Sequence, residues 1–217
     1  MSELMHDIII VCEDTYGLDV YMIIQAINAS SGEDKYNVIG LLIDNPDSLS
    51  GICPPVPLLG KVRGWNCKVE SNYVIAIRDP KHKKAAVETL KSKGAKFETI
   101  IAPWVQHPSD FTHGEGCIIA NYNFKRNSKF GDFVIMDTCM CESVEIGDYS
   151  TLSPFVNVTT ACIGNGVYIG THSAIISGRI INDNAFLHPG SIVLNNIREG
   201  MSVAGVPASR NLKKWEE

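Results

Sequence analysis

The sequence predicts an α/β domain followed by a β-solenoid in one chain of 217 residues. Two observations lead to this prediction. Apolar runs of strand length alternate with helical segments up to about residue 103. From about residue 128, aliphatic residues instead recur every six positions, a period that neither a helix nor an alternating strand produces. We therefore expect an α/β domain over 1–103, a β-solenoid over 104–197, and a tail over 198–217 that packs on the solenoid.

The first segment contains the patterns of four strands and two helices. The strands are expected at 7–11, 36–43, 72–77 and 97–101, and the helices at 18–27 and 81–92. Continuous apolar runs are typical of strands buried on both faces of a parallel sheet. Asp79 and Pro80 supply an N-cap and a first-turn proline for the second helix, and Gly94 ends it. Strand–helix alternation predicts a small parallel sheet with right-handed crossovers.

The repeat of six extends over most of the second segment. Its aliphatic positions are Val134, Met140, Ile146, Leu152 and Val158 and, after one step of five, Ile163, Ile169, Ile175, Ile181, Leu187 and Val193. A triangular solenoid explains this period, because one aliphatic side chain points inward from each flat face and three hexads close one coil. Small residues fit the corners, and stacked coils bury a ladder that a single coil cannot bury alone.

Composition excludes several classes of protein. A net charge of −5 disfavours nonspecific nucleic-acid binding, which needs a basic face. No apolar run approaches the roughly 20 residues of a membrane-spanning helix. The seven cysteines are irregularly spaced and lack zinc-site spacing, so we expect reduced thiols and no metal. The N-terminus has no basic flank before a long apolar stretch, which predicts a cytoplasmic protein without a secretion signal.

The hexads, the α/β segment and the closing stretch Gly205-Val206-Pro207-Ala208-Ser209 together resemble the bacterial nucleotide-sugar acyltransferases of the left-handed β-helix type. That family includes the sialic acid O-acetyltransferase and the acetyltransferase of the bacillosamine pathway. The resemblance covers nearly the whole chain. It implies a Rossmann-like N-terminal domain, a left-handed parallel β-helix of hexapeptide repeats, and a homotrimer. It also implies acetyl-CoA as co-substrate, held in a groove between two subunits.

The resemblance implies acyl transfer to a sugar or a nucleotide-linked amino sugar by direct attack on the thioester. A general base takes the proton of the acceptor, and backbone N–H groups hold the thioester oxygen. Two alternatives stay open. One is a non-catalytic trimeric paralogue that binds a ligand or CoA without turnover, and the other is an acyltransferase with a non-nucleotide acceptor. The absence of a G-x-G-x-x-G motif counts against a nicotinamide oxidoreductase.

The catalytic segment of the family reads His-Asp/Glu-x-x-Ile-Gly-Asp. The matching stretch here is Glu142-Ser143-Val144-Glu145-Ile146-Gly147-Asp148. Glu142 thus replaces the catalytic histidine and Ser143 replaces its acidic partner. An ionised glutamate is a weak base unless a desolvated groove makes it stronger. Because Met140 is expected to point inward, Glu142 two residues later is expected to point out of the core, either as the base or as a surface glutamate.

The resemblance also assigns positions along CoA: Thr160, Thr171, Pro189, Gly190, Ala204, Gly205 and Lys213. Thr160 is the match, to within one residue, for a turn whose N–H faces the thioester. His172 is either a substitute base, a CoA contact or a surface histidine beside a corner. Cys141 is not expected to act as a nucleophile, because no histidine lies near it in the sequence and the family forms no acyl-enzyme.

The expected acceptor-binding residues are Glu13, Asp14 and Asp44. The loop from Cys12 to Gly17 has one glycine and two acids, where the family has a glycine-rich turn that approaches a diphosphate. Two carboxylates repel a diphosphate unless a cation intervenes, so Glu13 and Asp14 favour a non-nucleotide acceptor. Asp44 matches the position that reads the base in the family, and it is equally suited to open a turn.

Overall fold

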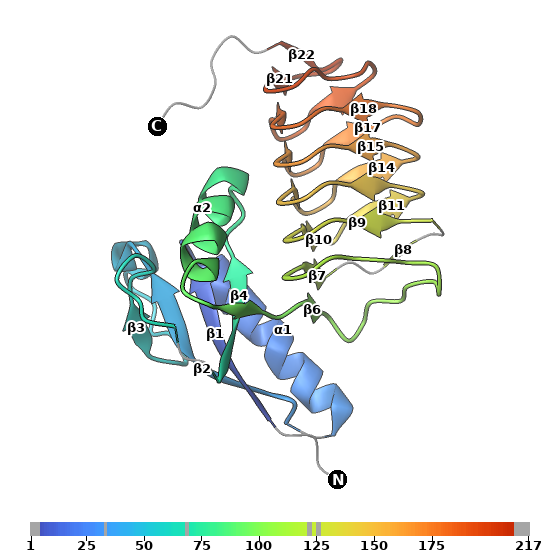
Figure 1. Ribbon diagram of the computed structural model, residues 1–217. Coiled ribbons are helices and arrows are strands. Elements are labelled where there is room, and N and C mark those ends of the chain that lie inside the picture. The colour runs from blue at the N-terminus through green and yellow to red at the C-terminus, as the bar shows by residue number, and fades with distance from the viewer. Residues whose placement is uncertain (1–4, 33, 68–69, 121–122, 125–126, 211–217) are drawn as a thin grey trace. The chain divides into compact units, whose positions relative to one another are not determined.

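The computed structural model describes residues 5–32, 34–67, 70–120, 123–124 and 127–210. The chain divides into two compact units, residues 1–103 and 104–217 (Figure 1). The first unit is a five-stranded parallel sheet in the order β3-β2-β1-β4-β5, with two α-helices. Its elements are β1 (His6–Cys12), α1 (Tyr16–Ser31), β2 (Tyr36–Ile43), the 3-10 helix η1 (Pro46–Leu49), β3 (Leu58–Gly60), β4 (Ser71–Ala76), α2 (Pro80–Lys91) and β5 (Lys96–Phe97).

The local chemistry of the first unit follows the sequence closely. Ile8 to Val11 are completely buried, as expected for a central strand covered on both faces. The Asp79 carboxylate accepts hydrogen bonds from the N–H groups of Lys81 and His82, both at 2.9 Å, and so caps α2. A Cβ at Gly17 would lie 2.6 Å from the Cβ of Cys12. The single glycine of the first loop therefore lets α1 begin directly against the end of β1.

The prediction of one strand over 97–101 is wrong. Residues 96–97 form β5 in the first sheet, and Ile100–Ile101 form β6 in a different sheet. The side chain of Glu98 accepts hydrogen bonds from the Tyr36 hydroxyl at 3.0 Å and from Asn72 Nδ2 at 2.9 Å. These two bonds fix the chain at the point where it leaves the first sheet. A continuous apolar pattern does not reveal such a change of sheet.

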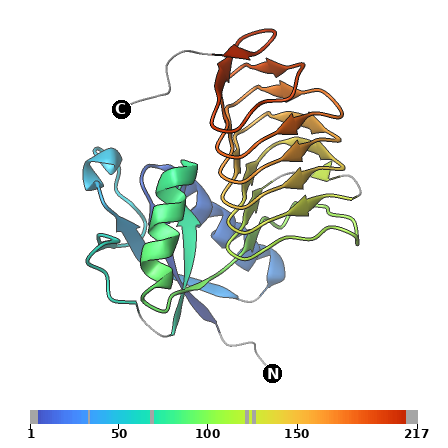
Figure 2. The ribbon, with the colours of Figure 1, turned by 45° about the horizontal axis from the view of Figure 1, so that its top comes forward.

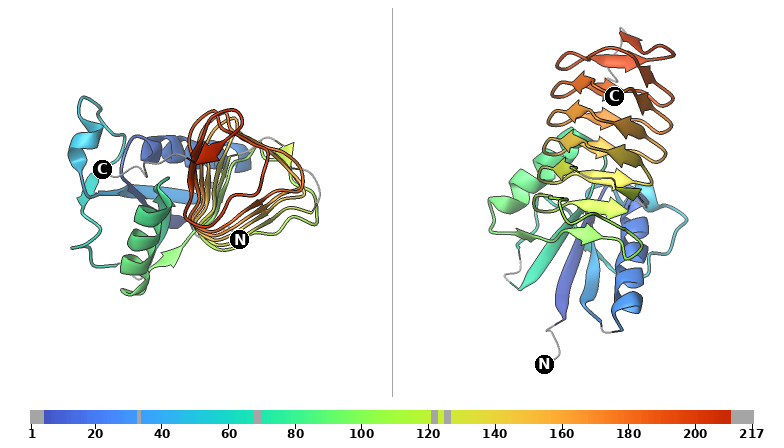
Figure 3. Two further views of the ribbon diagram at one scale, coloured as in Figure 1. Left: turned by 90° about the horizontal axis from the view of Figure 1, so that it is seen from above. Right: turned by 90° about the vertical axis from the view of Figure 1, so that its right-hand side faces the viewer.

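The second unit is a β-helix with three flat faces and a triangular outline (Figures 2 and 3). The first face is an eight-stranded sheet whose edge strand, β6 (Ile100–Ile101), precedes the boundary at residue 103. Its other strands are β7 (Ile118–Ala120), β10 (Ile135–Asp137), β13 (Thr151–Leu152), β16 (Tyr168–Ile169), β19 (Phe186–Leu187), β21 (Ser202–Ala204) and β22 (Ser209–Arg210). The second face consists of β8 (Asn123–Phe124), β11 (Met140–Glu142), β14 (Asn157–Thr159), β17 (Ala174–Ile175) and β20 (Ile192–Val193). The third face consists of β9 (Lys129–Phe130), β12 (Glu145–Ile146), β15 (Cys162–Ile163) and β18 (Ile180–Ile181).

The predicted inward positions are confirmed from Ile146 onward, where each aliphatic side chain of the repeat is buried. Before Ile146 the predicted phase is wrong. Met140 is 61% exposed, and the buried Cys141 pairs with the inward Val158 instead. In the same way Met136, rather than Val134, pairs with Leu152. The steps from Met136 to Cys141 and from Cys141 to Ile146 are each five residues, so a search for steps of six selected the wrong neighbours.

The final segment does more than pack on the β-helix. Ser202–Ala204 form β21, which pairs with β19 in parallel and continues the first face. Ser209–Arg210 then fold back as β22, antiparallel to β21. The tail expected from residue 198 therefore begins as a further coil. Lys213, one of the expected CoA contacts, lies outside the described residues.

Candidate functional site

The first unit has a pocket of about 370 Å³ at the carboxyl ends of β1, β2 and β4. Open parallel sheets bind ligands at the carboxyl ends of their strands. The binding position is beside the strand from which the chain connections to the two neighbouring strands run in opposite directions. Here that strand is β1, with β2 on one side and β4 on the other. Polar side chains of the lining include Glu13, Asp44, Arg63 and His82. The pocket thus contains two of the three expected acceptor-binding residues.

Glu13 lies beside His82 in this pocket, and the two form an ion pair when His82 is protonated. Its Oε1 lies 2.9 Å from Nδ1 of His82, in the first turn of α2. Burial raises the pKa of Glu13, while the nearby His82 acts in the opposite direction. The carboxylate charge is therefore partly balanced wherever His82 is protonated, and the repulsion expected from Glu13 toward an anionic ligand is reduced.

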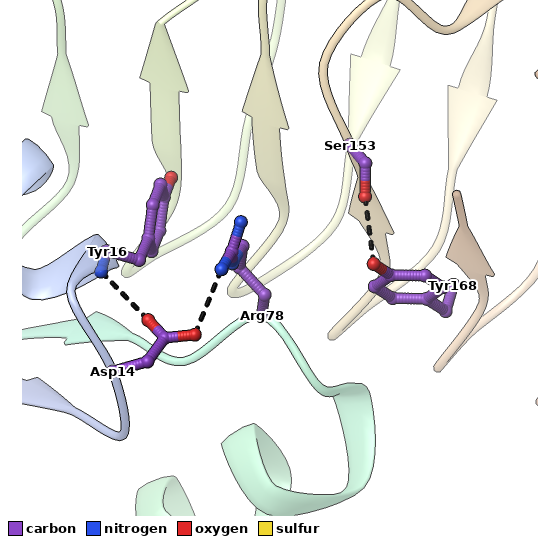
Figure 4. A network of polar contacts seen from close by, with 5 residues as sticks. All are labelled: Asp14, Tyr16, Arg78, Ser153 and Tyr168. Carbon is purple, nitrogen blue, oxygen red and sulfur yellow. Dashed lines mark hydrogen bonds and ion pairs between the residues drawn. The ribbon is translucent and has the colours of Figure 1, made fainter. Parts of the chain in front are cut away.

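Asp14 is also neutralised, and it has a local structural role (Figure 4). Its Oδ2 lies 2.9 Å from Nη2 of Arg78, and its Oδ1 accepts the Tyr16 N–H at 2.8 Å. That N–H belongs to the first turn of α1, the kind of group that binds phosphate at helix starts. The Asp14 carboxylate thus accepts a hydrogen bond from one backbone N–H that a diphosphate would otherwise use.

Asp44 shapes the rim of the pocket. Its Oδ1 accepts the N–H of Val62 at 2.7 Å, which links the end of β2 to the loop that carries Arg63. The same loop is held by Lys93, whose Nζ donates to the carbonyl oxygens of Arg63 and Trp65, both at 2.9 Å. Asp44 therefore fixes the pocket loop, as expected of a residue that opens a turn, and it also faces the pocket.

In the second unit, three expected site residues meet at the turns between the second and third faces. Glu142 ends β11 and pairs with Thr159 of β14 in the next coil. Ser143 and Thr160 follow them and occupy the same left-handed turn position in consecutive coils, with φ of 53° and 48°. The side chain of Glu142 is half-buried and alternates with the inward Cys141. It thus leaves the core as expected, although through a different register.

The expected thioester donor is already engaged in this structure. The Thr160 N–H donates to the carbonyl oxygen of Glu142 at 2.7 Å. This N–H is therefore not free to face a thioester in this structure. No hydrogen bond from the adjoining Ala161 N–H occurs within the part of the chain that the structure describes. Ala161, one residue further on, lies within the one-residue uncertainty of the resemblance.

A second group of expected residues lies at the turns between the first and second faces. The Thr171 hydroxyl donates to the Pro154 carbonyl at 2.6 Å, and the Thr171 carbonyl accepts the Gly190 N–H at 2.8 Å. His172, Pro189 and Gly190 are exposed at the same turns. His172 is therefore an exposed corner residue.

Ala204 and Gly205 lie at the end of the same row of turns. Ala204 ends β21, and the Gly205 carbonyl accepts the N–H of Ile192 at 3.0 Å. The face beside them bears aromatic side chains that the sequence analysis did not single out. Tyr168 and Phe186 stack at 4.7 Å, the Ser153 hydroxyl donates to the Tyr168 hydroxyl at 3.2 Å (Figure 4), and His188 Nε2 lies 2.8 Å from Ser202 Oγ.

The expected catalytic residues fall on opposite edges of the second face. Glu142 is the last residue of β11, while His172 precedes the first residue of β17. All neighbouring strands of this face run parallel, so strand starts and strand ends line different edges. One chain therefore does not bring Glu142 and His172 together. Burial raises the pKa of Cys141 to about 12, so its thiol stays protonated at neutral pH and is no nucleophile.

Sequence analysis missed the cations of the first unit, Arg78 and His82. Both follow the end of β4 closely, and β4 neighbours β1 in the sheet. Residues just after two adjacent parallel strands meet at one edge, so their position in the chain was a usable indication. Among the described residues, no group of three or more His, Cys, Asp or Glu side chains could hold a metal ion.

Solved structures of other proteins have the same architecture. The acetyltransferase domain of PglB from Neisseria gonorrhoeae superimposes with a TM-score of 0.81 at 16% identity, covering 95% of this chain and all of that one. PerB from Caulobacter crescentus, in complex with CoA and GDP-perosamine, gives a TM-score of 0.79 at 18% identity, covering 97% of this chain and all of that one. The chain has the fold of left-handed β-helix acetyltransferases.

The sequence comparison gives a shorter match. Galactoside O-acetyltransferase of Escherichia coli is 31% identical over 123 residues, a match that spans 48% of this chain and 57% of that protein. No protein-family model matches the chain. No helix in the described part of the chain has the length and apolar character needed to cross a membrane.

Proposed function

We propose that the protein transfers an acetyl group from acetyl-CoA to an amine or hydroxyl of a nucleotide-linked sugar. The proposal is carried by one observation: both units, together with their order in the chain, match acetyltransferase structures over 95–98% of the chain. One of these structures contains acetyl-CoA and another contains CoA with GDP-perosamine. The pocket at the carboxyl ends of β1, β2 and β4 is the acceptor site in this proposal.

Glu142 is the base in the proposed reaction. It accepts the proton of the sugar amine or hydroxyl as that group attacks the thioester carbon, and the proton then passes to the departing CoA thiolate. A new C–N or C–O bond forms and the C–S bond breaks. The backbone N–H of Ala161, in the next coil at the same edge, is the donor to the thioester oxygen.

The proposed site needs more than one copy of the chain. Glu142 and the expected CoA contacts Thr171, Pro189 and Gly190 lie on opposite edges of the second face. A homotrimer in which this face packs against a neighbouring copy would bring the two edges together across an interface. The trimer is therefore part of the proposal, and the acetyl-CoA groove lies between two copies.

A non-nucleotide acceptor is the second candidate, and one contact favours it. The Asp14 carboxylate takes the first-turn N–H of Tyr16, a donor that a diphosphate would otherwise use. An acceptor without a diphosphate does not need that donor. The pairing of Asp14 with Arg78 and of Glu13 with His82 favours the nucleotide-linked acceptor instead, because it reduces the repulsion expected from two free carboxylates.

The test is transfer of acetyl from acetyl-CoA to GDP- and UDP-linked amino sugars and to the free sugars. Mass spectrometry should detect the product, because the exposed thiols of Cys53 and Cys162 would consume a thiol reagent. Glu142→Gln should lower turnover about 100- to 10,000-fold, the usual cost of losing a general base. Acetyl-CoA binding should change little, since the carboxylate acts on the acceptor.

Glu145→Gln is the matched control, because Glu145 lies in the next strand and its exposed ion pair with Lys129 contributes little. Full turnover in Glu142→Gln would exclude Glu142 as the base. The double change Glu142→His with Ser143→Asp restores the family pair, and aspartate tolerates the left-handed backbone at 143. Activity gained only in that double variant would identify the chain as a non-catalytic paralogue.

A further inference from the structure

A column of turn residues between the first and second faces differs from the other turns. Phe155, His172 and Gly190 occupy equivalent positions in three consecutive coils, and we call them the ring column. All three have left-handed backbone conformations, with φ of 63°, 58° and 73°. The N–H of His172 donates to Pro154 in the preceding coil, and the N–H of Gly190 donates to Thr171. The distance between members of the ring column is therefore the distance between consecutive coils.

The first two members form an exposed aromatic stack. The rings of Phe155 and His172 are 4.9 Å apart and 15° from parallel. This separation matches the spacing of neighbouring strands in a sheet, about 4.8 Å. Phe155 is 58% exposed and His172 is also exposed. One face of the His172 ring packs on Phe155. The other faces the position where the next coil carries Gly190 instead of a third ring.

At Gly190 the column has no side chain, and the space is open. A Cβ placed on Gly190 would have no other atom within 4 Å. The left-handed backbone alone does not demand glycine here, because histidine and phenylalanine adopt the same conformation one and two coils earlier, respectively. What glycine provides at this position is room beside His172.

A second aromatic column lacks such room, although the turn glycines Gly178 and Gly200 are as open as Gly190. Phe133 and Tyr149 stack at 5.3 Å and 7° at the turns between the third and first faces. A Cβ on Gly116, one coil before Phe133, would collide with the Phe133 ring. A Cβ on Gly166, one coil after Tyr149, would lie 2.8 Å from Oδ1 of Asn184. In that column the chain fills the glycine positions, whereas at Gly190 it does not.

We infer that the base of a nucleotide ligand stacks on His172 in the space beside Gly190. A base is a flat heteroaromatic ring that can stack on an aromatic side chain, and such stacking needs no particular hydrogen bond. The inference rests on the proposed function, under which the adenine of CoA is the base. The guanine or uracil of a nucleotide-linked acceptor is a second source of the same chemistry.

The test compares ligands that have the ring with one that lacks it. The probes are CoA, 3′,5′-ADP, GDP, UDP and 4′-phosphopantetheine, with dissociation constants measured by calorimetry. His172→Ala should weaken the binding of the ring-containing ligand roughly 5- to 100-fold. It should leave the binding of 4′-phosphopantetheine unchanged, and His172→Phe should preserve ring binding. Weakened CoA and 3′,5′-ADP identify adenine, while weakened GDP or UDP identifies the base of the acceptor.

Gly190→Asn fills the open space with a residue that tolerates the left-handed backbone, as Asn184 does in another turn. It should weaken ring binding as His172→Ala does. Gly200→Asn is the matched control, because Gly200 has φ of 65° and equally open space at a different edge. Unchanged nucleotide binding in both site variants, or an equal loss for 4′-phosphopantetheine, overturns the inference. Lack of acetyl transfer in a wild type that still shows the ring effect would instead count against the proposed function alone.

Discussion

Burial destabilises the ionised carboxylate of Glu13, and the neighbouring His82 only partly offsets this effect. Burial raises its pKa above the ordinary value of 4.5, and the nearby His82 opposes this shift. A carboxyl group with a higher pKa in the folded state binds a proton more readily when folded. Its contribution to stability is therefore fully present below about pH 4.5 and is lost as pH rises through the folded-state pKa.

This linkage predicts the pH dependence of Glu13→Gln. The melting temperature of the wild type, relative to that of the variant, should fall as pH rises from about 4 to 8. Thermal unfolding of both proteins across that range measures the difference. Glu88→Gln, which changes an exposed carboxylate on α2 of the same unit, is the matched control. A difference that stays constant or rises with pH would contradict the assigned burial of Glu13.

At the scale of secondary-structure elements, a ladder of Asp and Asn side chains joins the coils at the turns between the third and first faces. Asp132, Asp148, Asn165 and Asp183 each accept, through Oδ1, a backbone N–H of the preceding coil at 2.8–3.0 Å. Glycine stands opposite each Oδ1, at 114, 131, 147 and 164, where a Cβ would collide with it. The recurrent Gly-Asp and Gly-Asn pairs of the sequence thus have a mechanical cause: glycine in one coil leaves room for the carboxylate or amide of the next.

Gly147→Ala should therefore destabilise the β-helix. Its Cβ would lie 2.5 Å from Oδ1 of Asn165 and 2.7 Å from the carbonyl carbon of Gly164, so neighbouring coils must move apart. Overpacking of this kind costs about 1–3 kcal/mol, which lowers the melting temperature by about 2–4 °C per kcal/mol in a chain of this size. Gly64→Ala, where a Cβ meets open space, should leave the melting temperature unchanged. Equal melting temperatures for both variants would disprove the steric role of the ladder.

At the scale of the whole molecule, the second face exposes three large apolar side chains. Met140, Ile176 and Leu194 lie on this face or directly beside its strands and are 61%, 40% and 42% exposed. Contiguous exposed apolar surface is typical of a face that packs against another molecule. Ile176 and Leu194 continue the column of Glu142 and Thr159 in the following coils, so they lie at the edge where the proposed site needs a second copy.

We expect the wild type to sediment at three times the 23.8 kDa of one chain. Ile176→Asp with Leu194→Asp should place two charges in the interface and shift the protein toward the monomer, with loss of acetyl transfer. Met22→Asp changes an equally exposed apolar residue on α1 and should leave the mass unchanged. A wild type that sediments as a monomer at micromolar concentration would rule out both the trimer and a site between copies.

The sequence by itself determined the two-part architecture and most of its elements. Runs such as Ile8–Val11 and the hexads after Ile146 record burial that repeats along the chain, so local periodicity is enough to find them. The cap at Asp79 was equally predictable, because its partners lie within three residues. The resemblance pointed to Glu142 on a coil and to Glu13 and Asp44 after strand ends, and two of these residues, Glu13 and Asp44, line one pocket.

Only the tertiary structure decided the features that depend on contacts between distant segments. The phase around Met136 and Cys141 is set by pairing with Leu152 and Val158 in the next coil, and local spacing favoured a different choice. The neutralisation of Asp14 comes from Arg78, 64 residues away. The separation of Glu142 from His172 follows from the parallel direction of the strands between them. These features arise from lateral pairing and side-chain packing, which a one-dimensional pattern does not contain.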